Sequence, residues 1–251
     1  MESYRVKING IDVDASYSEE TVQEIFLPLL QRLTRLQAEK KKRLVVFLAA
    51  PPGAGKSTLA SYLEKLSEEH EELCNIQAVG MDGFHRRQEY LTSHYTEVDG
   101  RTIPMVDIKG APVTFDLEKL TQAIESVSSR ESILWPSYDR HLHNPVEGTY
   151  RIMAKIVLIE GNYLLLNKDG WRDLRRYADY CIKITAKEDF LRERLIDRKI
   201  KSGNSEDKAR EFVNFSDMAN VRICLDDSQE ADMVLALDDA GEYHLESLKR
   251  N

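Results

Sequence analysis

The stretch LVVFLAAPPGAGKSTLA, residues 44–60, constrains the fold more than any other part of this 251-residue chain. Seven apolar residues are followed by a turn that contains glycine, then a lysine, a serine and the start of a predicted helix. Short apolar runs are typical of buried strands, and Gly53 and Gly55 allow the backbone to turn sharply. The pattern therefore predicts a strand, a loop and a helix in immediate succession, with the loop suited to an anion at the start of the helix.

The loop fits the eight-residue frame of a Walker A motif, with Ala50 where the first glycine usually stands. In this motif backbone amides surround the phosphates, the lysine reaches the β and γ phosphates, and the hydroxyl binds Mg²⁺. A glycine-rich turn can arise by chance, but here the strand and the helix both stand in register with it. We therefore expect the following residues to hold the phosphates of a nucleotide: Gly53, Ala54, Gly55, Lys56, Ser57 and Thr58.

Beyond this motif, apolar strands alternate with helices, which is typical of an α/β fold with a mostly parallel sheet between two helical layers. The predicted strands are residues 44–49, 76–81, 132–135, 155–160, 179–185 and 232–237. The predicted helices are residues 57–69, 116–128, 170–177, 187–201 and 206–224. We predict one domain over residues 44–251, preceded by an appendage over residues 1–43.

The appendage is predicted to be a hairpin followed by a helix. Alternating apolar residues flank Asn9–Gly10, a strong signal for a hairpin turn. Ser16 and Glu19 have the spacing of a capping box, and Pro28 is expected to kink the helix. One apolar stripe follows the helical period: Val22, Ile25, Phe26, Leu29, Leu30, Leu33 and Leu36. The stripe is expected either to pack on the flank of the sheet or to form a homodimer.

The composition narrows the partners of the chain. A formal net charge of −8 argues against a nucleic acid or an anionic membrane as the main partner, because both attract basic surfaces. The three cysteines lie far apart and predict neither disulfides nor a zinc site. No apolar run approaches the roughly 20 residues of a membrane helix, and the N-terminus lacks the pattern of a signal peptide. We therefore expect a cytoplasmic location.

Two acidic residues end predicted strands, and ligands of such sheets bind at the carboxyl ends of the strands. Asp82 follows the second strand, where it is expected either to accept a proton from an attacking hydroxyl or to cap a helix. Glu160 ends the fourth strand, and beside a Walker A motif it is expected to support Mg²⁺ directly or through water. The Asp-x-x-Gly of a GTPase switch does not stand at the end of this fourth strand, and no Asn-Lys-x-Asp motif for guanine follows it.

Five segments in this order resemble one family. APPGAGKST, MDGFH, KGAPVTFD, PSYDRHLHNP and IEGNYLLL, within residues 44–225, are similar to the kinases that include type I pantothenate kinase, uridine–cytidine kinase and phosphoribulokinase. They look most similar to a nucleoside/nucleotide kinase-like branch, also called fructose-transport-system kinase-like. The resemblance implies ATP, Mg²⁺, a five-stranded parallel core, a helical lid, and Asp82 as the catalytic base.

The segment PSYDRHLHNP bears on the acceptor. By resemblance to the uridine–cytidine kinases, Tyr138 and His143 match a tyrosine and a histidine that line the pyrimidine pocket. Arg140 stands where an aromatic residue would be, and a guanidinium favours a carboxylate, a phosphate or paired hydroxyls. His85, three residues after Asp82, is expected in the same acceptor pocket. A metal pair at His141 and His143 lacks further ligands, whereas ordinary surface histidines remain an alternative.

The segment EDFLRERLIDRKIK resembles the lid of the family. By this resemblance Arg194 closes on the transferring phosphate, while Arg198 is one residue out of step with the uridine kinases. A solvated helix with acidic partners is the alternative for these arginines. Asn220, on a late predicted helix, is expected to contact the acceptor or adenine, or else to cap the core. Asp116 is expected either to cap the helix 117–128 or to bind a ligand.

The residues together predict an ATP-dependent kinase that phosphorylates a hydroxyl of a small metabolite: a sugar, a pantothenate-like acid or a nucleoside. The predicted partners are therefore ATP and that acceptor. A regulatory or scaffold protein with a degenerate nucleotide site is the alternative. The retention of Lys56, Asp82, Glu160 and Arg194 argues against it, because a decayed kinase rarely keeps all four.

Overall fold

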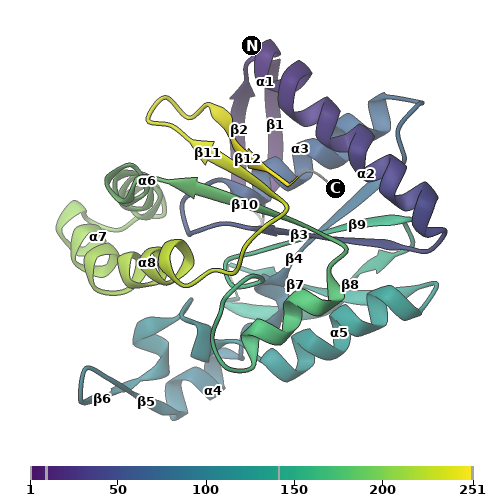
Figure 1. Cartoon of the computed structure of the whole chain (residues 1–251). Helices are drawn as coiled ribbons and strands as arrows, with labels where there is room; N and C mark the ends of the chain where they lie inside the picture. Colours follow the sequence, from purple (N-terminus) through teal and green to yellow (C-terminus); the bar gives the residue numbers. More distant parts are fainter. Residues whose placement is uncertain (1, 9–10, 141, 250–251) are drawn as a thin grey trace.

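The computed structural model describes residues 2–8, 11–140 and 142–249, and its centre is one twisted sheet (Figure 1). The strands follow the order β12 (Tyr243–Leu248), β11 (Met233–Leu237), β10 (Tyr180–Ala186), β3 (Leu44–Ala49), β9 (Ile156–Gly161) and β4 (Ile76–Gly80). All neighbours are parallel except β11 and β12. The prediction of a mostly parallel α/β sheet with five parallel strands is confirmed, and β12 adds an antiparallel sixth strand at the edge.

The strand predicted at 132–135 is present, but its assignment to this sheet was wrong. Strand β7 (Ile133–Asp139) pairs antiparallel with β8 (Asn144–Ile152) in a separate hairpin. Its side chains alternate between buried Trp135 and exposed Leu134, which is the pattern of a strand with one solvated face. The indole N–H of Trp135 donates to the carbonyl of Gly80 over 2.8 Å and ties the hairpin to the end of β4.

The apolar run of β3 is continuous because both of its faces are buried. Its alternate residues divide between the two cores, with Val46 among α2 (Leu27–Lys40) and α3 (Lys56–Glu69), and Phe47 beside α5 (Leu117–Ser129). Figure 1 shows α2 and α3 on one side of the sheet and α5 on the other. The carboxyl end of β3 therefore lies between two fixed layers, where the loop to α3 begins.

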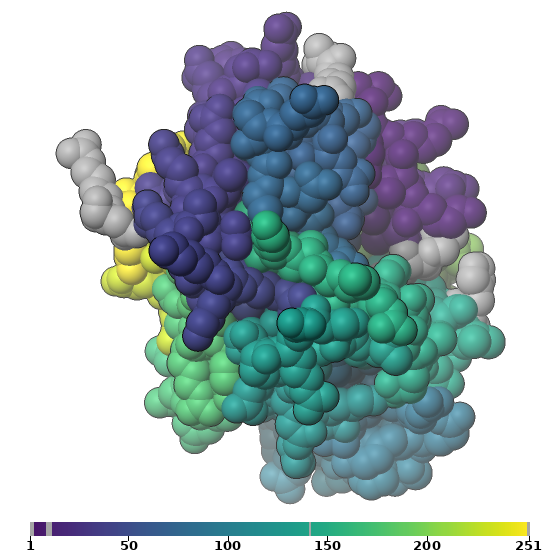
Figure 2. Space-filling view, turned by 90° about the vertical axis from the view of Figure 1, so that its right-hand side faces the viewer, coloured from purple at the N-terminus to yellow at the C-terminus, as the bar shows by residue number. Residues whose placement is uncertain are grey.

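The N-terminal segment packs into the first of these cores. Strands β1 (Glu2–Ile8) and β2 (Ile11–Tyr17) pair in register, whereas the predicted Asn9–Gly10 turn lies outside the described residues. Figure 2 shows the purple N-terminal residues directly against the blue surface of α3. The contact is aromatic and joins the hairpin to α3 and β12: Tyr4, Tyr17, Phe26, Tyr62 and Tyr243.

Two details of this segment differ from the prediction. Strand β2 continues to Tyr17, so the helix is capped by Ser18, whose hydroxyl accepts from the amide of Thr21 over 3.1 Å, and not by Ser16. The short α1 (Glu19–Thr21) passes through a π-helical turn, η1 (Val22–Phe26), into α2. Pro28 lies in the first turn of α2, directly after the wide turn, where its missing N–H is tolerated.

Other elements surround the carboxyl ends of the strands. After β4 come the 3₁₀ turn η2 (Met81–Phe84), α4 (Gln88–Ser93) and a small hairpin of β5 (Tyr95–Val98) and β6 (Arg101–Pro104), followed by the 3₁₀ turns η3 (Met105–Ile108) and η4 (Pro112–Thr114). The helix predicted at 170–177 is a 3₁₀ helix, η5 (Trp171–Tyr177). No described helix is long and apolar enough to cross a membrane.

The helix predicted at 206–224 is interrupted. It divides into α7 (Glu206–Phe212), a π-helical segment η6 (Val213–Asp217) and α8 (Met218–Asp226). Together with α6 (Glu188–Lys201) these helices form a group beside the sheet, above α4, β5 and β6 in Figure 1. The loop after β3, helix α6, which was predicted as the lid, and the turn after β4 therefore meet at one end of the sheet.

Candidate active site

The loop between β3 and α3 has the backbone that an anion cradle requires. Gly53 and Gly55 have φ values of +87° and +80°, a left-handed region that disfavours other residues. A Cβ on Gly53 would lie 3.1 Å from Cγ of Leu195, so the loop also packs closely on the lid helix. The hydroxyl of Tyr243 donates to the carbonyl of Ala54 over 3.2 Å and holds the loop from the side of β12.

Helix α3 begins at Lys56, directly after this loop, so its free amides point towards the space that the loop encloses. Lys56, Ser57 and Thr58 lie in its first turn. The structure thus places all six residues of the predicted cradle in one short segment between a buried strand and a helix of 14 residues. This geometry suits a phosphate group.

Ser57 and Glu160 face each other across the cradle. The hydroxyl of Ser57 donates to Oε1 of Glu160 over 2.8 Å, and the glutamate is only 7% exposed. Gly80 on the neighbouring β4 allows this approach, because a Cβ there would lie 2.8 Å from the same oxygen. Burial raises the pKa of Glu160, against the lowering effect of Lys56 and of the serine hydroxyl. A hydroxyl and a carboxylate, both oxygen donors, fit the preference of Mg²⁺.

Asp82 lies within the 3₁₀ turn η2 that follows β4. Burial alone would raise the pKa of this carboxyl, but the surrounding positive groups outweigh burial and hold the pKa below its ordinary value of 3.8. In order of effect, these groups are His85, Lys56, Arg140 and Arg198. Asp82 is therefore a charged carboxylate at neutral pH, beside the lysine of the cradle, and no helix of the described chain is capped by its side chain.

His85 and Tyr138 form an aromatic wall next to Asp82. The ring of His85 lies 3.9 Å from that of Phe115 and 5.0 Å from that of Tyr138, measured between centroids. Its Nδ1 lies 2.9 Å from the carbonyl of Asp82. Burial lowers the pKa of His85 despite the nearby aspartate, so the ring is neutral at pH 7. Burial raises the pKa of Tyr138 to about 12, which keeps its hydroxyl protonated.

The two lid arginines lie in different places. Nη2 of Arg194 is 3.5 Å from the position of a Cβ on Gly55, so this guanidinium lies against the phosphate cradle. Arg198, one turn further along α6, is among the groups whose charge acts on Asp82. The family resemblance predicted that Arg194 contacts the transferring phosphate and left the role of Arg198 open. The i,i+4 spacing puts both arginines on one face of the helix, and this spacing was the signal that both reach the site.

The three remaining residues that were predicted to bind the acceptor lie in different environments. Arg140 follows β7 and acts electrostatically on Asp82 and Glu160. The side chain of His143 is exposed, and its carbonyl accepts from Nζ of Lys109 over 2.8 Å. Asn220 is 3% exposed on α8.

Asp116, for which two roles stood open, caps α5. Its carboxylate accepts from the amide of Lys119 over 3.2 Å.

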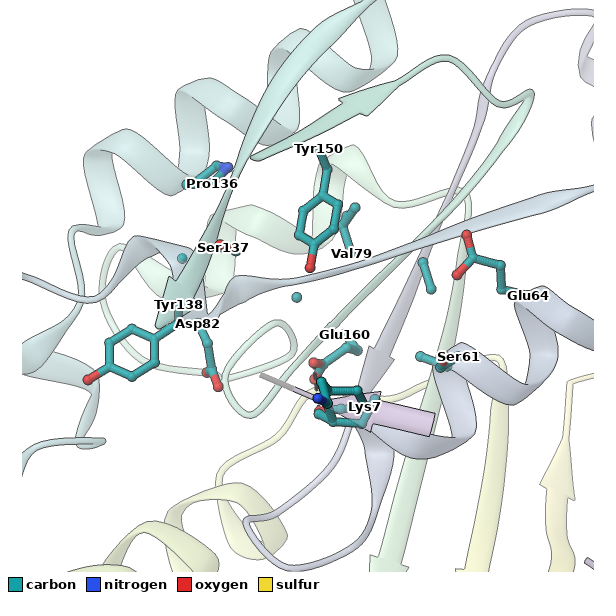
Figure 3. A pocket seen from close by; sticks show the side chains of 16 residues that line it. Lys7, Ser61, Glu64, Val79, Asp82, Pro136, Ser137, Tyr138, Tyr150 and Glu160 are labelled. Atoms are coloured by element: carbon teal, nitrogen blue, oxygen red, sulfur yellow. Dashed lines mark hydrogen bonds between the residues drawn. The ribbon is translucent and has the colours of Figure 1, made fainter. Parts of the chain in front are cut away.

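A cavity of about 250 Å³ opens between α3, β4 and the β7–β8 hairpin, and Asp82, Glu160 and Ser57 line one end of it. This volume suits a small metabolite, since sites for larger ligands start at about 300 Å³. Figure 3 shows Asp82 and Glu160 in its wall and Lys7 of the N-terminal hairpin reaching it from outside the nucleotide-binding segment. Sequence patterns gave no indication of Lys7, because nothing local connects the hairpin to the site.

A phosphate cradle, an oxygen pair suited to Mg²⁺ and a charged aspartate at the end of the next strand define a P-loop nucleotide-binding protein. No family model matches the chain. The chain is 39% identical over 241 residues to "Uncharacterized protein YggC" of Escherichia coli, covering 96% of this chain and 98% of that protein. It is 31% identical to "Putative uridine kinase C227.14" of Schizosaccharomyces pombe, covering 78% and 83%.

The structure adds a solved relative, the "putative fructose transport system kinase" from Silicibacter sp. TM1040. The two share 30% identity with a TM-score of 0.71, over 82% of this chain and 98% of that chain. The chain belongs to the P-loop kinases of the phosphoribulokinase, uridine kinase and pantothenate kinase group.

Proposed function

We propose that this protein transfers the γ-phosphate of ATP to a hydroxyl group of a small metabolite. The observation that carries the proposal is Asp82, a carboxylate kept charged beside the cradle lysine and across from the Ser57–Glu160 pair. A charged carboxylate in this position is suited to accept the proton of an attacking hydroxyl. A protein that only bound nucleotide would have no use for it.

The acceptor oxygen forms a bond to the γ-phosphorus while the bond from that phosphorus to the β–γ bridging oxygen breaks, and ADP leaves with that oxygen. The hydroxyl proton passes to Asp82. Lys56 and Arg194 lie where they can neutralise the phosphates, and Ser57 and Glu160 would hold the Mg²⁺ that balances the charge of the nucleotide.

The acceptor is a polar molecule, and the charges around Asp82 support this. Arg140 and Arg198 act on Asp82 itself. Lys109 acts on the neighbouring His85, and Lys199 lies close enough to Arg140 and Arg198 for their charges to act on it. Guanidinium groups bind carboxylates and phosphates through paired, charge-assisted hydrogen bonds. We therefore favour a sugar or an acidic metabolite over uridine or cytidine, although one of the relatives is named a putative uridine kinase.

A coupled assay of ADP release tests the proposal, with sugars, sugar acids, pantothenate and nucleosides as acceptors. We expect turnover with at least one sugar or acid, and almost none in Asp82→Asn, which keeps the shape of the side chain. Stabilisation by ATP without transfer to any acceptor would contradict the proposal and favour a regulatory nucleotide-binding protein. Efficient phosphorylation of uridine would show that the role given to Arg140 is wrong.

A further inference from the structure

Asp217 is a buried carboxylate without a hydrogen-bonding partner for one of its oxygens. The residue is 8% exposed, and Oδ2 accepts no hydrogen bond from any described residue. Nζ of Lys199 is 3.8 Å away, too far for a hydrogen bond. Since an unsatisfied buried oxygen destabilises the fold, a group that the chain itself does not supply is expected there.

The backbone around Asp217 also departs from regular α-helical geometry. The residue ends the π-helical segment η6 between α7 and α8, and single π-helical turns inside helices occur frequently at functional sites. Ser216, beside it, also has a buried hydroxyl without a hydrogen bond to any described residue. Two neighbouring unsatisfied side chains at a widened turn are better explained by ligand binding than by folding.

Asn220 lies one helical turn after Asp217 and is therefore on the same face of the helix. It is 3% exposed, and its Nδ2 is 3.7 Å from the position of a Cβ on Gly110. The carbonyl of Gly110 accepts from the hydroxyl of Tyr163 over 2.6 Å, which fixes that loop. The side chains of Asp217 and Asn220 thus share the face of the helix that approaches the loop after Lys109.

Arg198 connects this face to the reaction centre. The charges of Asp217 and Asp82 both act on its guanidinium, and that of Arg140 acts on it as well. Burial raises the pKa of the Tyr163 hydroxyl, and the charges of both carboxylates add to this effect. The geometry agrees, because the loop that Asn220 approaches follows Lys109, whose Nζ lies 5.3 Å from the centroid of the Tyr138 ring in the wall beside Asp82. The face of Asp217 and Asn220 is therefore on the side of Tyr138.

We propose that Asp217 and Asn220 bind a second hydroxyl group of the acceptor, so that the acceptor is a polyol such as a sugar. A carboxylate accepts hydrogen bonds and an amide both donates and accepts, a combination that matches neighbouring hydroxyls. A site built to bind a hydroxyl rejects an analogue without it. The inference rests on the proposed function. In the alternative, Asp217 is only a counter-ion for Lys199 and Arg198.

The first experiment separates these roles without any acceptor. We expect Asp217→Asn to unfold at the same temperature as the wild type or at a higher one at pH 7, because it removes a buried charge that lacks a hydrogen bond. Asp226→Asn, an exposed position at the end of the same helix, is the matched control and should change nothing. A melting temperature several degrees lower in Asp217→Asn alone would show a counter-ion and overturn the inference.

The second experiment measures binding of D-fructose, D-ribose, D-sorbitol and 2-deoxy-D-ribose by calorimetry, with Mg²⁺ and a non-hydrolysable ATP analogue present. We expect at least one of the first three to bind the wild type, ribose more tightly than its deoxy analogue if ribose is the one that binds, and about 10- to 100-fold weaker binding in Asp217→Ala. Binding of the ATP analogue should be unchanged in that variant.

Binding of none of the polyols to the wild type, or equal binding to Asp217→Ala, would overturn the inference. A polyol that binds in an Asp217-dependent manner but is never phosphorylated from ATP would instead contradict the proposed kinase function and leave this site in place. The two failures are therefore distinguishable.

Discussion

The phosphate cradle occupies one uninterrupted loop between β3 and α3, whereas the residues on the acceptor side come from the turn after β4, the end of β7, the lid helix and the π-helical segment. The cradle acts largely through backbone amides, which any sequence with the right glycines can present. The acceptor side acts through side chains on separate elements, each of which can change alone. One kinase scaffold can therefore keep ATP and exchange acceptors.

The two carboxylates at the junction of these regions have pKa values that are shifted in opposite directions. Glu160, on the cradle side, has a raised pKa because it is buried. Asp82, on the acceptor side, has a lowered pKa because positive groups outweigh its burial. The two carboxylates thus lie at the ends of adjacent strands with opposite pKa shifts, and we propose the first as a ligand of Mg²⁺ and the second as the base.

The largest expected effects come from one variant on each side. Lys56→Met and Asp82→Asn should each lower kcat by about 10² or more. Only Lys56→Met should also weaken ATP binding, because Asp82 faces the acceptor. Titration calorimetry with ATP, together with the coupled assay, checks this. Equal loss of ATP affinity in both variants would mean that the two sides are not separate.

The next largest effect is expected at Arg140. Arg140→Ala should raise the KM of a sugar or acidic acceptor about 10- to 100-fold through loss of a charge-assisted hydrogen bond, and leave the KM of ATP near the wild-type value. Arg140→Lys, which keeps the charge but not the planar fork, should lie between the two. If the KM of ATP moves first, Arg140 belongs to the phosphate side.

The opposite pKa shifts predict opposite effects on stability without Mg²⁺ and nucleotide. A carboxyl group whose pKa is raised by folding destabilises the folded state at pH values above its ordinary pKa. Glu160→Gln should therefore melt a few degrees higher than the wild type at pH 7, and this difference in melting temperature should vanish below about pH 4. A lowered pKa stabilises the fold above 3.8, so Asp82→Asn should melt lower at pH 7, with the difference lost as the pH falls below that value. Shifts of the same sign in calorimetric scans would contradict the contrast between the two carboxylates.

The smallest effect is expected outside both regions. Glu147 on β8 forms an exposed ion pair with Lys119 on α5. Glu147→Ala should destabilise the protein by less than about 1 kcal/mol and change neither KM. Denaturant unfolding and steady-state kinetics measure both quantities, and an effect on the acceptor KM would extend the acceptor side along the β7–β8 hairpin.

The sequence predicted the cradle and five parallel strands because both depend on contiguous patterns. Residues 50–57 are a local motif, and strands such as β3 and β9 are apolar on both faces. Strand β7 was assigned to the wrong sheet, because a short apolar run does not indicate its pairing partner. The π-helical segment at 213–217 was also missed, since its side chains keep nearly helical spacing.

The acceptor side was predicted only in part, Asp82 from its place after a strand and the others through resemblance. Asp82 and Tyr138 stand in segments that look like the family, whereas Arg198 and Asp217 reach the site through tertiary packing of α6 against α7 and α8. Lys7 reaches the cavity because another residue of the hairpin, Tyr4, packs against Tyr62 of α3 and so fixes the hairpin there. The spacing of residues within one segment therefore cannot predict these tertiary contacts.

The most direct test of the central claim follows the phosphate itself. The wild type is incubated with Mg²⁺, ATP labelled in its γ-phosphate and a mixture of sugars and sugar acids, and the products are separated by mass. The account predicts the label in a phosphate monoester of one of these molecules, and none above background with Asp82→Asn. Label that remains in ATP or appears only as inorganic phosphate, with every sugar and acid unmodified, would contradict it.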